Sequence, residues 1–517
     1  MTMKIQASTS VAEIVRICPS ARKIFDRHGL HGCGGEHGPA ESLEFFARVH
    51  EVDLAALLED LNAEMDTPPA EPYAYRETLA DYIYRRFFKA GIAIVLSLGG
   101  MWGVISLMRI SLGKELLQPS LLPAIHAHAH AMIFGWVGLF VMGFAYQSFP
   151  RFKNTTLWKP QLANLTLYLM LVGILLRATA DLAQHGPWAL GLGGISVTAE
   201  VTAIALFMTI ILRTSRQSIS PHNPYEAFIL AAMVWFLVQA IFDGFFFFAE
   251  ATAINLQQTV FRTALLDAPL RDIQLFGFAA LITAGVSQRF VPVVYGLGRP
   301  RRDRQKLIFW LMNGSLLLDV LSYVALFLTG NADWAVALEL AYILMALWAV
   351  LLVVQLRVFT RTTQSDRSWK FIRAAYVWLL MAMIMLPLLM PYGIWSSQGF
   401  SHAFWGAHLH AFTVGFISMM IIGVSSRVVP ILAGIDSNQL TSLWGPFVLL
   451  NTGCAGRVLL QILTDWRPAT AYSLIGLTGV LELTALAWWG IGLWRVMNLS
   501  KTHRGNVLRA PVPLAVR

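Results

Sequence analysis

Long apolar runs alternate with short polar segments over most of the chain, from Ala90 to Met497. Each run holds about twenty residues, and a helix of that length crosses a hydrocarbon core about 30 Å thick. The pattern predicts an all-α membrane protein with twelve spans. The expected spans are residues 90–109, 125–149, 161–180, 189–212, 226–249, 272–295, 307–329, 334–356, 372–392, 403–429, 444–464 and 470–495.

Residues 1–66 have a different pattern, because they are charged and carry the short amphipathic stretches VAEIVRI and SLEFFARVHEVDLAALLEDLNAEM. These stretches predict a compact helical unit in the cytoplasm. We expect a linker over 67–89, a membrane domain over 90–497 and a cytoplasmic tail over 498–517.

The phrase HGLHGCGGEHGP interrupts this helical unit, and its glycines favour a tight turn over a helix. The turn and its neighbours carry several groups that can bind metal or haem: His28, His31, Cys33, His37 and His50. An equal alternative is a partner-docking unit whose turn happens to be rich in histidine.

Composition supports the membrane assignment. Hydrophobic residues make up 56% of the chain, charged residues 13%, and the mean hydropathy is +0.58, which excludes an ordinary soluble protein. Three cysteines give no disulfide framework.

Lysine and arginine indicate the orientation, since short loops rich in them stay on the cytoplasmic side. They are concentrated before the first expected span, in alternate loops and after the last span, and no signal peptide is visible. We therefore expect a multi-pass protein of the inner (plasma) membrane with both termini in the cytoplasm. The net charge of +9 indicates topology and contact with lipid headgroups, not nucleic acid binding.

A fixed register recurs three times in the membrane domain. The phrases are HAHAHAMIFGWVGLFVMGFAYQSFP, RDIQLFGFAALITAGVSQRFVP and HLHAFTVGFISMMIIGVSSRVVP. Gly277 follows Gly135 by 142 residues, and Gly415 follows Gly277 by 138. A second glycine, a proline and then Arg177, Asp319 or Arg457 follow each time at the same spacing. The register predicts three pseudo-symmetric units of four helices.

Six of the thirteen histidines lie at the start of spans two and ten, at matched places in units one and three. They are His126, His128, His130, His402, His408 and His410. Residues at i and i+2 of a helix are about 200° apart, so His128 and His130 point in nearly opposite directions, as do His408 and His410. The arrangement favours two porphyrins held between helices over one compact zinc site. His126 and His402 are weaker candidates, because either could lie at the interface or support a ligand.

These motifs resemble two families over roughly 80–500. The histidines on helix two and the His-x-His of helix ten are similar to those of subunit I of the haem-copper oxidases and nitric oxide reductases. HAMIFGWVGLFVMGF and HLHAFTVGF resemble the NnrS family, membrane haem proteins linked to nitric oxide metabolism and nitrosative stress. RKIFDRHGLHGCGG, near the N-terminus, resembles the ScdA/RIC iron-sulfur repair proteins.

The membrane-domain resemblance implies one or two haems, of b type. His128 and His410 would be the axial ligands of a low-spin haem, His408 would be the proximal ligand of a second haem, and His130 is a further candidate. A departure separates the chain from the oxidases, because 272–329 contains no histidine and Asp272 stands at the repeat position of His130. Copper is therefore not expected, and neither is reduction of oxygen to water.

Other polar residues in the spans allow two interpretations each. Arg177 and Arg457 could bind haem propionates or form structural ion pairs, and Asp319 could pair with an arginine. Asp243 and Glu250 could belong to a proton or cation path, or Glu250 could lie at the interface.

Three functions follow. The first is a haem protein that binds a diatomic gas such as NO or O2 between helices two and ten. The second is an oxidase-like or reductase-like subunit that takes electrons from quinol, cytochrome c or another redox partner. The third is a transporter, which parallel threefold repeats make less favoured.

Overall fold

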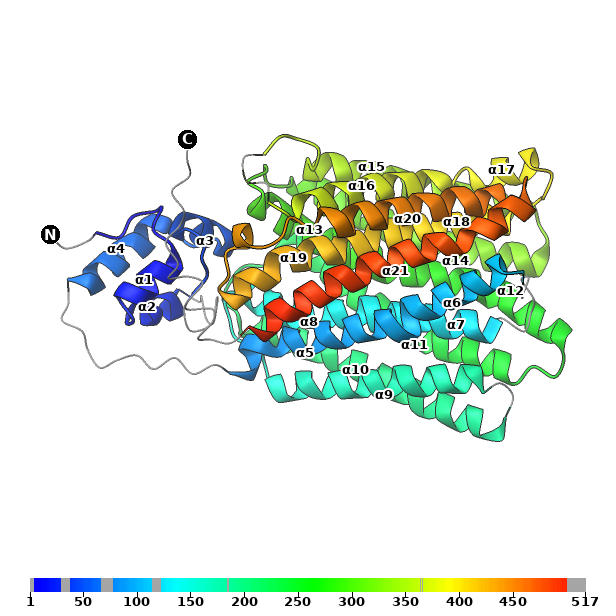
Figure 1. The fold of residues 1–517 in the computed structure, drawn as a ribbon, viewed down its shortest axis with the longest axis horizontal. Helices are drawn as coiled ribbons and strands as arrows, with labels where there is room; N and C mark the ends of the chain where they lie inside the picture. Colours follow the sequence, from blue (N-terminus) through cyan, green and yellow to red (C-terminus); the bar gives the residue numbers. More distant parts are fainter. Residues whose placement is uncertain are drawn as a thin grey trace.

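The computed structural model describes residues 4–28, 38–66, 78–113, 122–183, 186–362, 364 and 366–499. Within these ranges the chain is helical, and its β-structure is limited to one isolated bridge between Ser10 and Ser42. Long helices lie side by side in a bundle, and a small helical unit sits against one end of it (Figure 1). We call the end beside this unit the near end and the opposite end the far end.

The described part of the bundle has eleven helices long and apolar enough to span a membrane, or up to twelve with one bent pair. They are α5/η2/α6 (Leu79–Ser111), α7/η4/α8 (Leu122–Phe152), α9 (Pro160–Leu182), α10 (Pro187–Gln217), α11 (Pro224–Ala251), α12/η5/α13 (Leu256–Val294), α14 (Arg302–Thr329), α15 (Asp333–Leu356), α18/η6/α19 (His402–Ala433), α20 (Trp444–Leu463) and α21 (Pro468–Asn498). The predicted all-α membrane architecture is thus confirmed.

The bent pair is α16 (Trp369–Met385) with α17 (Leu389–Trp395), which meet at 58°. Pro387 lies between them, and proline removes a helical hydrogen bond and clashes with the preceding turn. The span expected over 372–392 therefore breaks near its far end.

The first span is longer than its apolar run. Its helix begins at Leu79, inside the stretch expected as a linker, after a capping box in which Thr78 and Asp81 satisfy each other's backbone groups. Polar residues can join a spanning helix where it leaves the hydrocarbon, and hydropathy alone does not mark that point.

Three π-helical segments of eight residues occur at the predicted repeat positions. They are η4 (Ala131–Gly138), η5 (Ile273–Ala280) and η6 (Ala411–Ser418), which follow directly after His130, Asp272 and His410. The π-helix is rare in proteins, and where it occurs it is often part of a functional site.

The glycine inside each π segment lies against a large side chain. A Cβ on Gly135 would meet Ile94 at 2.4 Å, one on Gly277 would meet Trp235 at 2.9 Å, and one on Gly415 would meet Trp378 at 2.5 Å. Trp235 and Trp378 each donate to an asparagine, Asn313 or Asn451, at 3.0 Å. The asparagine stands 36 residues after the glycine in units two and three, while the threefold symmetry itself stays a prediction.

The small unit, which we call the N-terminal unit, has a hydrophobic core of its own. Its helices are α1 (Val11–Ile17), α2 (Ala21–Arg27), α3 (Leu43–His50) and α4 (Leu54–Met65). Ser10, Ser42 and Asp53 cap α1, α3 and α4 through their side chains. The turn expected between α2 and α3, with Cys33 and His37, lies outside the described residues.

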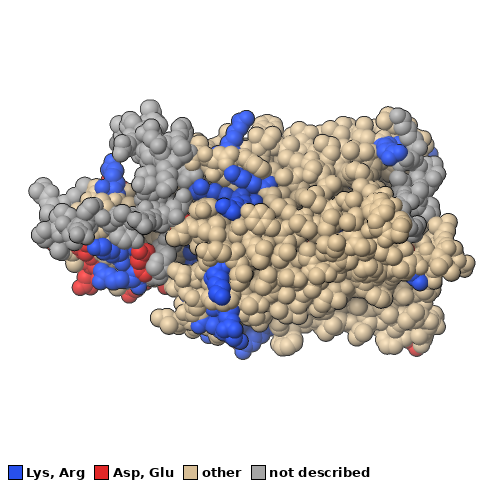
Figure 2. All heavy atoms as spheres, turned by 90° about the horizontal axis from the view of Figure 1, so that it is seen from below, with Lys and Arg blue, Asp and Glu red and all other residues tan. Residues whose placement is uncertain are grey.

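Charge is unevenly distributed along the molecule. Figure 2 shows Lys and Arg gathered on the bundle beside the N-terminal unit, while the middle of the visible face is almost free of charged atoms. Such a bare band is expected of a surface that faces lipid.

Candidate functional site

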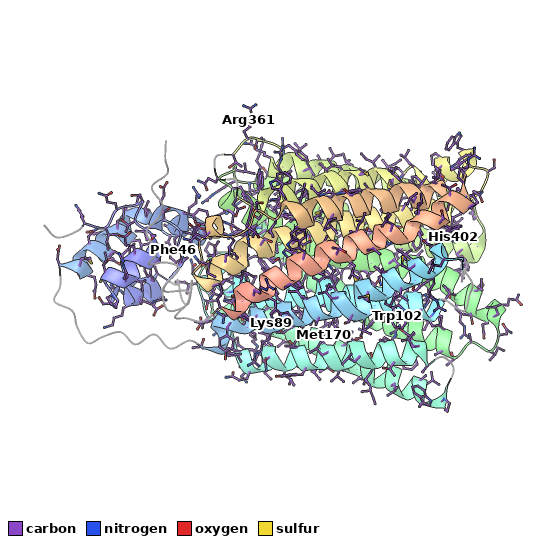
Figure 3. The ribbon with its side chains drawn as sticks, viewed as in Figure 1. Phe46, Lys89, Trp102, Met170, Arg361 and His402 are labelled. Carbon is purple, nitrogen blue, oxygen red and sulfur yellow. The ribbon has the colours of Figure 1, made fainter. Side chains whose placement is uncertain are left out.

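The candidate histidines lie on α7 (Leu122–His130) and α18 (His402–His410), toward the far end of the bundle. Figure 3 shows His402 at the end opposite the N-terminal unit, whereas Arg361 and Lys89 lie near that unit. The structure divides the six histidines by what their rings contact.

Three histidines are anchored by backbone carbonyl groups. Nδ1 of His128 lies 2.9 Å from the oxygen of Gly99, Nδ1 of His408 lies 2.8 Å from that of Ala382, and Nδ1 of His410 lies 2.9 Å from that of Gly406. A carbonyl oxygen can only accept, so each Nδ1 donates a proton and each Nε2 is left with its lone pair. Metal-binding histidines are commonly held in this way.

Local helix breaks supply two of these carbonyls. Gly99 ends the π-helical segment η2 (Val95–Gly99), and Ala382 is in the last turn of α16, where carbonyls have no intrahelical partner. Gly103, one turn beyond Gly99, leaves room for the His128 ring, because a Cβ there would lie 2.8 Å from Cε1 of His128.

Two buried groups near this site have unused hydrogen-bonding capacity. Nε2 of His408 has no partner among the described residues, and neither have Nε and Nη1 of Arg457. The carbonyl-anchored histidines and Arg457 thus fit a metal-centred, anionic group such as haem.

The other two histidines of α7 contact carboxylates. His130 is only 2% exposed, and its Nε2 lies 2.8 Å from Glu200 while its Nδ1 lies 3.2 Å from Asp243. Nδ1 of His126 lies 2.8 Å from Glu250. Glu200 therefore engages Nε2 of His130, and Asp243 lies within ion-pair distance of Nδ1, so this histidine belongs to a carboxylate cluster and lacks the carbonyl anchoring of the other three.

The two candidate arginines also divide into one that pairs with carboxylates and one that does not. Arg177 binds Asp243 at 2.7 Å and Asp181 at 3.0 Å, so the contacts favour the structural ion-pair interpretation for it. Arg457 keeps free guanidinium nitrogens, as described above, with Glu482 as a nearby opposite charge.

At the matching register positions of unit two, Asp272 replaces the histidine and Asp319 replaces the arginine. The neighbouring Arg271 pairs with Asp267 and donates to Gln274. Asp272 and Asp319 are both buried, and neither carboxyl oxygen of Asp319 has a hydrogen-bond partner among the described residues, so the expected pairing of Asp319 with an arginine is not found there. Gln274 donates to Gln239 at 3.0 Å. A carboxyl group that is buried without a cation is costly to ionise.

His402 is exposed and packs on the ring of Phe400, at 4.9 Å between centroids, so it lies at the surface. Asp243 and Glu250 each contact a histidine of α7, and Thr263 also bonds Glu250. The sequence analysis missed Glu200, Asp181 and Gly103. Glu200 is an isolated acid within an apolar run, and that signal alone could have drawn attention to it.

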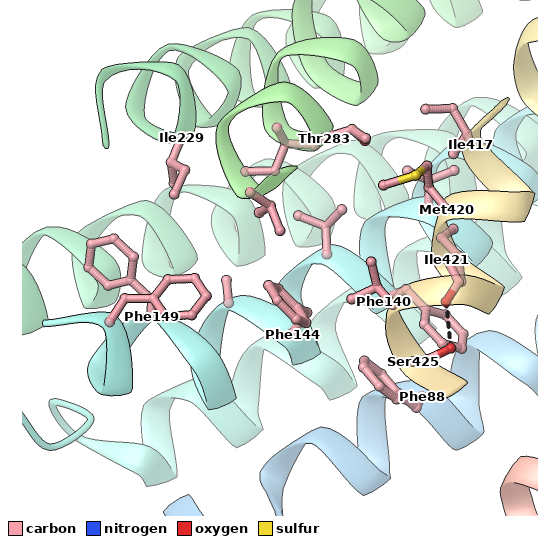
Figure 4. Close-up of a pocket in the computed structure, with 17 residues that line it drawn as sticks. Phe88, Phe140, Phe144, Phe149, Ile229, Thr283, Ile417, Met420, Ile421 and Ser425 are labelled. Carbon is pink, nitrogen blue, oxygen red and sulfur yellow. Dashed lines mark hydrogen bonds between the residues drawn. The ribbon is translucent and has the colours of Figure 1, made fainter. Parts of the chain in front are cut away.

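An apolar cavity of about 90 Å³ lies between α8 (Leu139–Phe152), α13 (Leu281–Val294) and α19 (Met419–Ala433) (Figure 4). Phe144, Val286 and Val424 line it at equivalent places of the three repeats. It extends toward the near end through Phe149 and Phe152, and no histidine is among its lining residues. The cavity is therefore separate from the histidine site.

Comparison with known proteins identifies one family. A family model described as NnrS protein matches residues 78–499, which is most of the chain and all of the described bundle. No curated protein matches the chain. The N-terminal unit lies outside the matched range, and its resemblance to iron-sulfur repair proteins stays a prediction, as does the likeness to haem-copper oxidases.

Proposed function

The chain belongs to the NnrS family, and from that premise we propose that it is a haem-binding membrane protein of nitric oxide metabolism or nitrosative stress. The single observation that carries the proposal is the shared anchoring of His128, His408 and His410, each by a backbone carbonyl at Nδ1. That anchoring fixes the tautomer that leaves Nε2 able to bind iron.

We assign His128 and His410 to one haem and His408 to a second. The equal anchoring of His128 and His410 at Nδ1 supports the first assignment, and the orphaned Nε2 of His408 supports the second. Arg457 would bind a propionate, while His130 and Arg177 would stay in their ion-pair network. When bound, the haem held by His408 would supply an iron able to bind a diatomic gas.

The orientation that we propose places the N-terminal unit, and with it the near end, in the cytoplasm of a cell with this protein in its plasma membrane. The gathering of Lys and Arg beside the N-terminal unit supports it, because basic residues are retained on the cytoplasmic side. The histidine site would then lie toward the outer face.

Absorption spectra of the purified protein test the proposal. We expect reduced wild-type protein to show haem bands, part of which shift on exposure to carbon monoxide or nitric oxide. His128→Ala and His410→Ala should each lose the low-spin component, because each removes one of the two histidines that would hold this haem. His408→Ala should lose the gas-sensitive component.

The matched control is His402→Ala, which removes an exposed histidine from the same helix as His408 and His410. It should keep the wild-type haem content and bands. The proposal fails if the purified wild type contains no haem, or if all four variants keep the wild-type spectrum.

A further inference from the structure

Two buried arginines hold the N-terminal unit to the bundle. Arg289 and Arg427 each stand twelve residues after the glycine of their π segment, near the ends of α13 and α19. Arg289 lies 3.4 Å from Glu51, and Arg427 lies 3.0 Å from Glu41. The two helices thus present matching cations to two carboxylates of one small unit.

Further contacts tie helix α3 to the same arginines. Arg289 donates to the carbonyl oxygen of Val49 at 2.8 Å, and the guanidinium of Arg427 lies 5.1 Å from the centre of the Phe45 ring. Arg48 of α3 also bonds Gln364 in a loop of the bundle. Residues 41–51 therefore lie across the near ends of α13 and α19.

The contact is buried enough to matter energetically. The side chain of Arg289 is 5% exposed and that of Arg427 is 9% exposed. Burial raises the pKa of Glu41, and the charge of Arg427 opposes that rise. Arg427 also pairs with Asp366 of the bundle at 3.1 Å and keeps that partner when the unit leaves. Arg289 loses Glu51, and a buried charge that loses its partner is costly, so water or another anion must replace Glu51 on release.

The near end of the apolar cavity lies next to this contact. Phe152 lines the cavity and also lies under Arg289, with 5.5 Å from guanidinium to ring centre. On the opposite wall Ser425 lines the cavity two residues before Arg427. The residues that bind the N-terminal unit are thus adjacent in sequence or space to those at the near end of the cavity.

We propose that the N-terminal unit is a gate, whose segment 41–51 docks on Arg289 and Arg427 and closes the near end of the apolar cavity to small apolar molecules. The segment that occupies this surface belongs to the same chain. Release of the unit opens the cavity from the side on which the unit lies. The inference goes beyond the proposed haem chemistry and does not depend on it.

The test measures access to the cavity through a reporter thiol. Ser425 is 2% exposed and lines the cavity, so Ser425→Cys places a thiol there with little change in size. The full-length protein reacts with methyl methanethiolsulfonate, a small neutral reagent, and peptide mass spectrometry follows this reporter thiol separately from the native cysteines. Hydrogen exchange over residues 43–50 reports release of the unit in the same samples.

Charge reversals on the N-terminal unit leave the bundle unaltered. In the background of S425C, the pair Glu41→Arg and Glu51→Arg places like charges against Arg427 and Arg289. We expect residues 43–50 to exchange faster and the reporter thiol to react about tenfold faster or more, since two buried pairs are lost. Glu44→Arg is the matched control, because Glu44 is exposed on the same helix, and it should change neither reading.

A charge swap tests the specific pairing. Arg289→Glu combined with Glu51→Arg should bring the reaction of the reporter thiol back toward the rate of S425C alone, while Glu51→Arg by itself stays fast. The proposal is overturned if residues 43–50 are released and the reporter thiol still reacts at the original rate, which would mean another entrance. It is equally overturned if the double reversal changes neither reading, because the arginine contacts would not hold the unit.

Discussion

Arg177 and Arg457 occupy the same register position in units one and three, yet their surroundings differ. Arg177 is paired with Asp243 and Asp181, whereas Nε and Nη1 of Arg457 have no partner among the described residues. A paired buried charge and an unpaired one respond differently to removal. This difference separates a structural role from a binding role.

Thermal unfolding of two leucine variants tests this difference. Arg177→Leu leaves Asp243 and Asp181 without their cation, so we expect a loss of about 3–5 kcal/mol of stability. Arg457→Leu removes a buried cation that has no ion pair within 4 Å among the described residues and only Glu482 as a nearby opposite charge, so it should lower stability by less than Arg177→Leu does, while it weakens haem retention. Equal destabilisation by the two variants would contradict the assignment of Arg457 to a ligand.

Single-residue chemistry was only partly predictable from the sequence. The depth of each histidine in the membrane and the side of the helix on which it lies could be predicted, because its position along the span fixes both. The hydrogen-bond partners could not, since His128 and His408 bind carbonyls of Gly99 and Ala382, which lie 29 and 26 residues away on other helices. Whether a histidine can bind iron depends on those partners.

At the scale of elements, the π segments η4, η5 and η6 shape the three spans that contain them. Their positions coincide with glycines that sequence reasoning had already aligned, but the widened turns themselves have no pattern in hydropathy. A π segment shifts the helix register, and the carbonyls and side chains beyond it point in new directions. The break after η2 thus presents Gly99 to His128.

Gly103→Ala is expected to disturb the site without disturbing the fold. Its new Cβ would lie 2.8 Å from Cε1 and 3.1 Å from Nδ1 of His128, so the ring must move away from the carbonyl of Gly99. We expect a shifted or weakened low-spin haem band in the absorption spectrum, at nearly wild-type yield and unfolding temperature.

The control for this substitution is Gly314→Ala on α14, where a Cβ would meet nothing within 4 Å. Alanine favours helix over glycine by about 1 kcal/mol, so this variant should be slightly more stable and spectroscopically unchanged. If Gly103→Ala also leaves the spectrum unchanged, His128 does not bind the haem that we assign to it.

At the scale of the whole molecule, the number of spans was predictable because hydrophobic length is a local property. The docking of the N-terminal unit was not. Arg289 lies within the predicted sixth span, and the sequence analysis attributed basic residues near the span ends to topology. Their roles as partners for Glu51 and Glu41 depend on a contact between segments more than 200 residues apart in sequence, which no local pattern records.

The orientation of the whole molecule gives the last prediction. Asn331 and Arg361 are both exposed, and they lie in the loops at opposite ends of the single span α15. Arg361 lies beside the N-terminal unit in Figure 3. If basic loops are retained in the cytoplasm, then Asn331→Cys places its thiol outside and Arg361→Cys places its thiol inside. A membrane-impermeant maleimide applied to intact cells should therefore label the N331C variant above the wild-type background, whereas the R361C variant should gain label only after the cells are opened. The reverse pattern would place the N-terminal unit outside and the histidine site toward the cytoplasm.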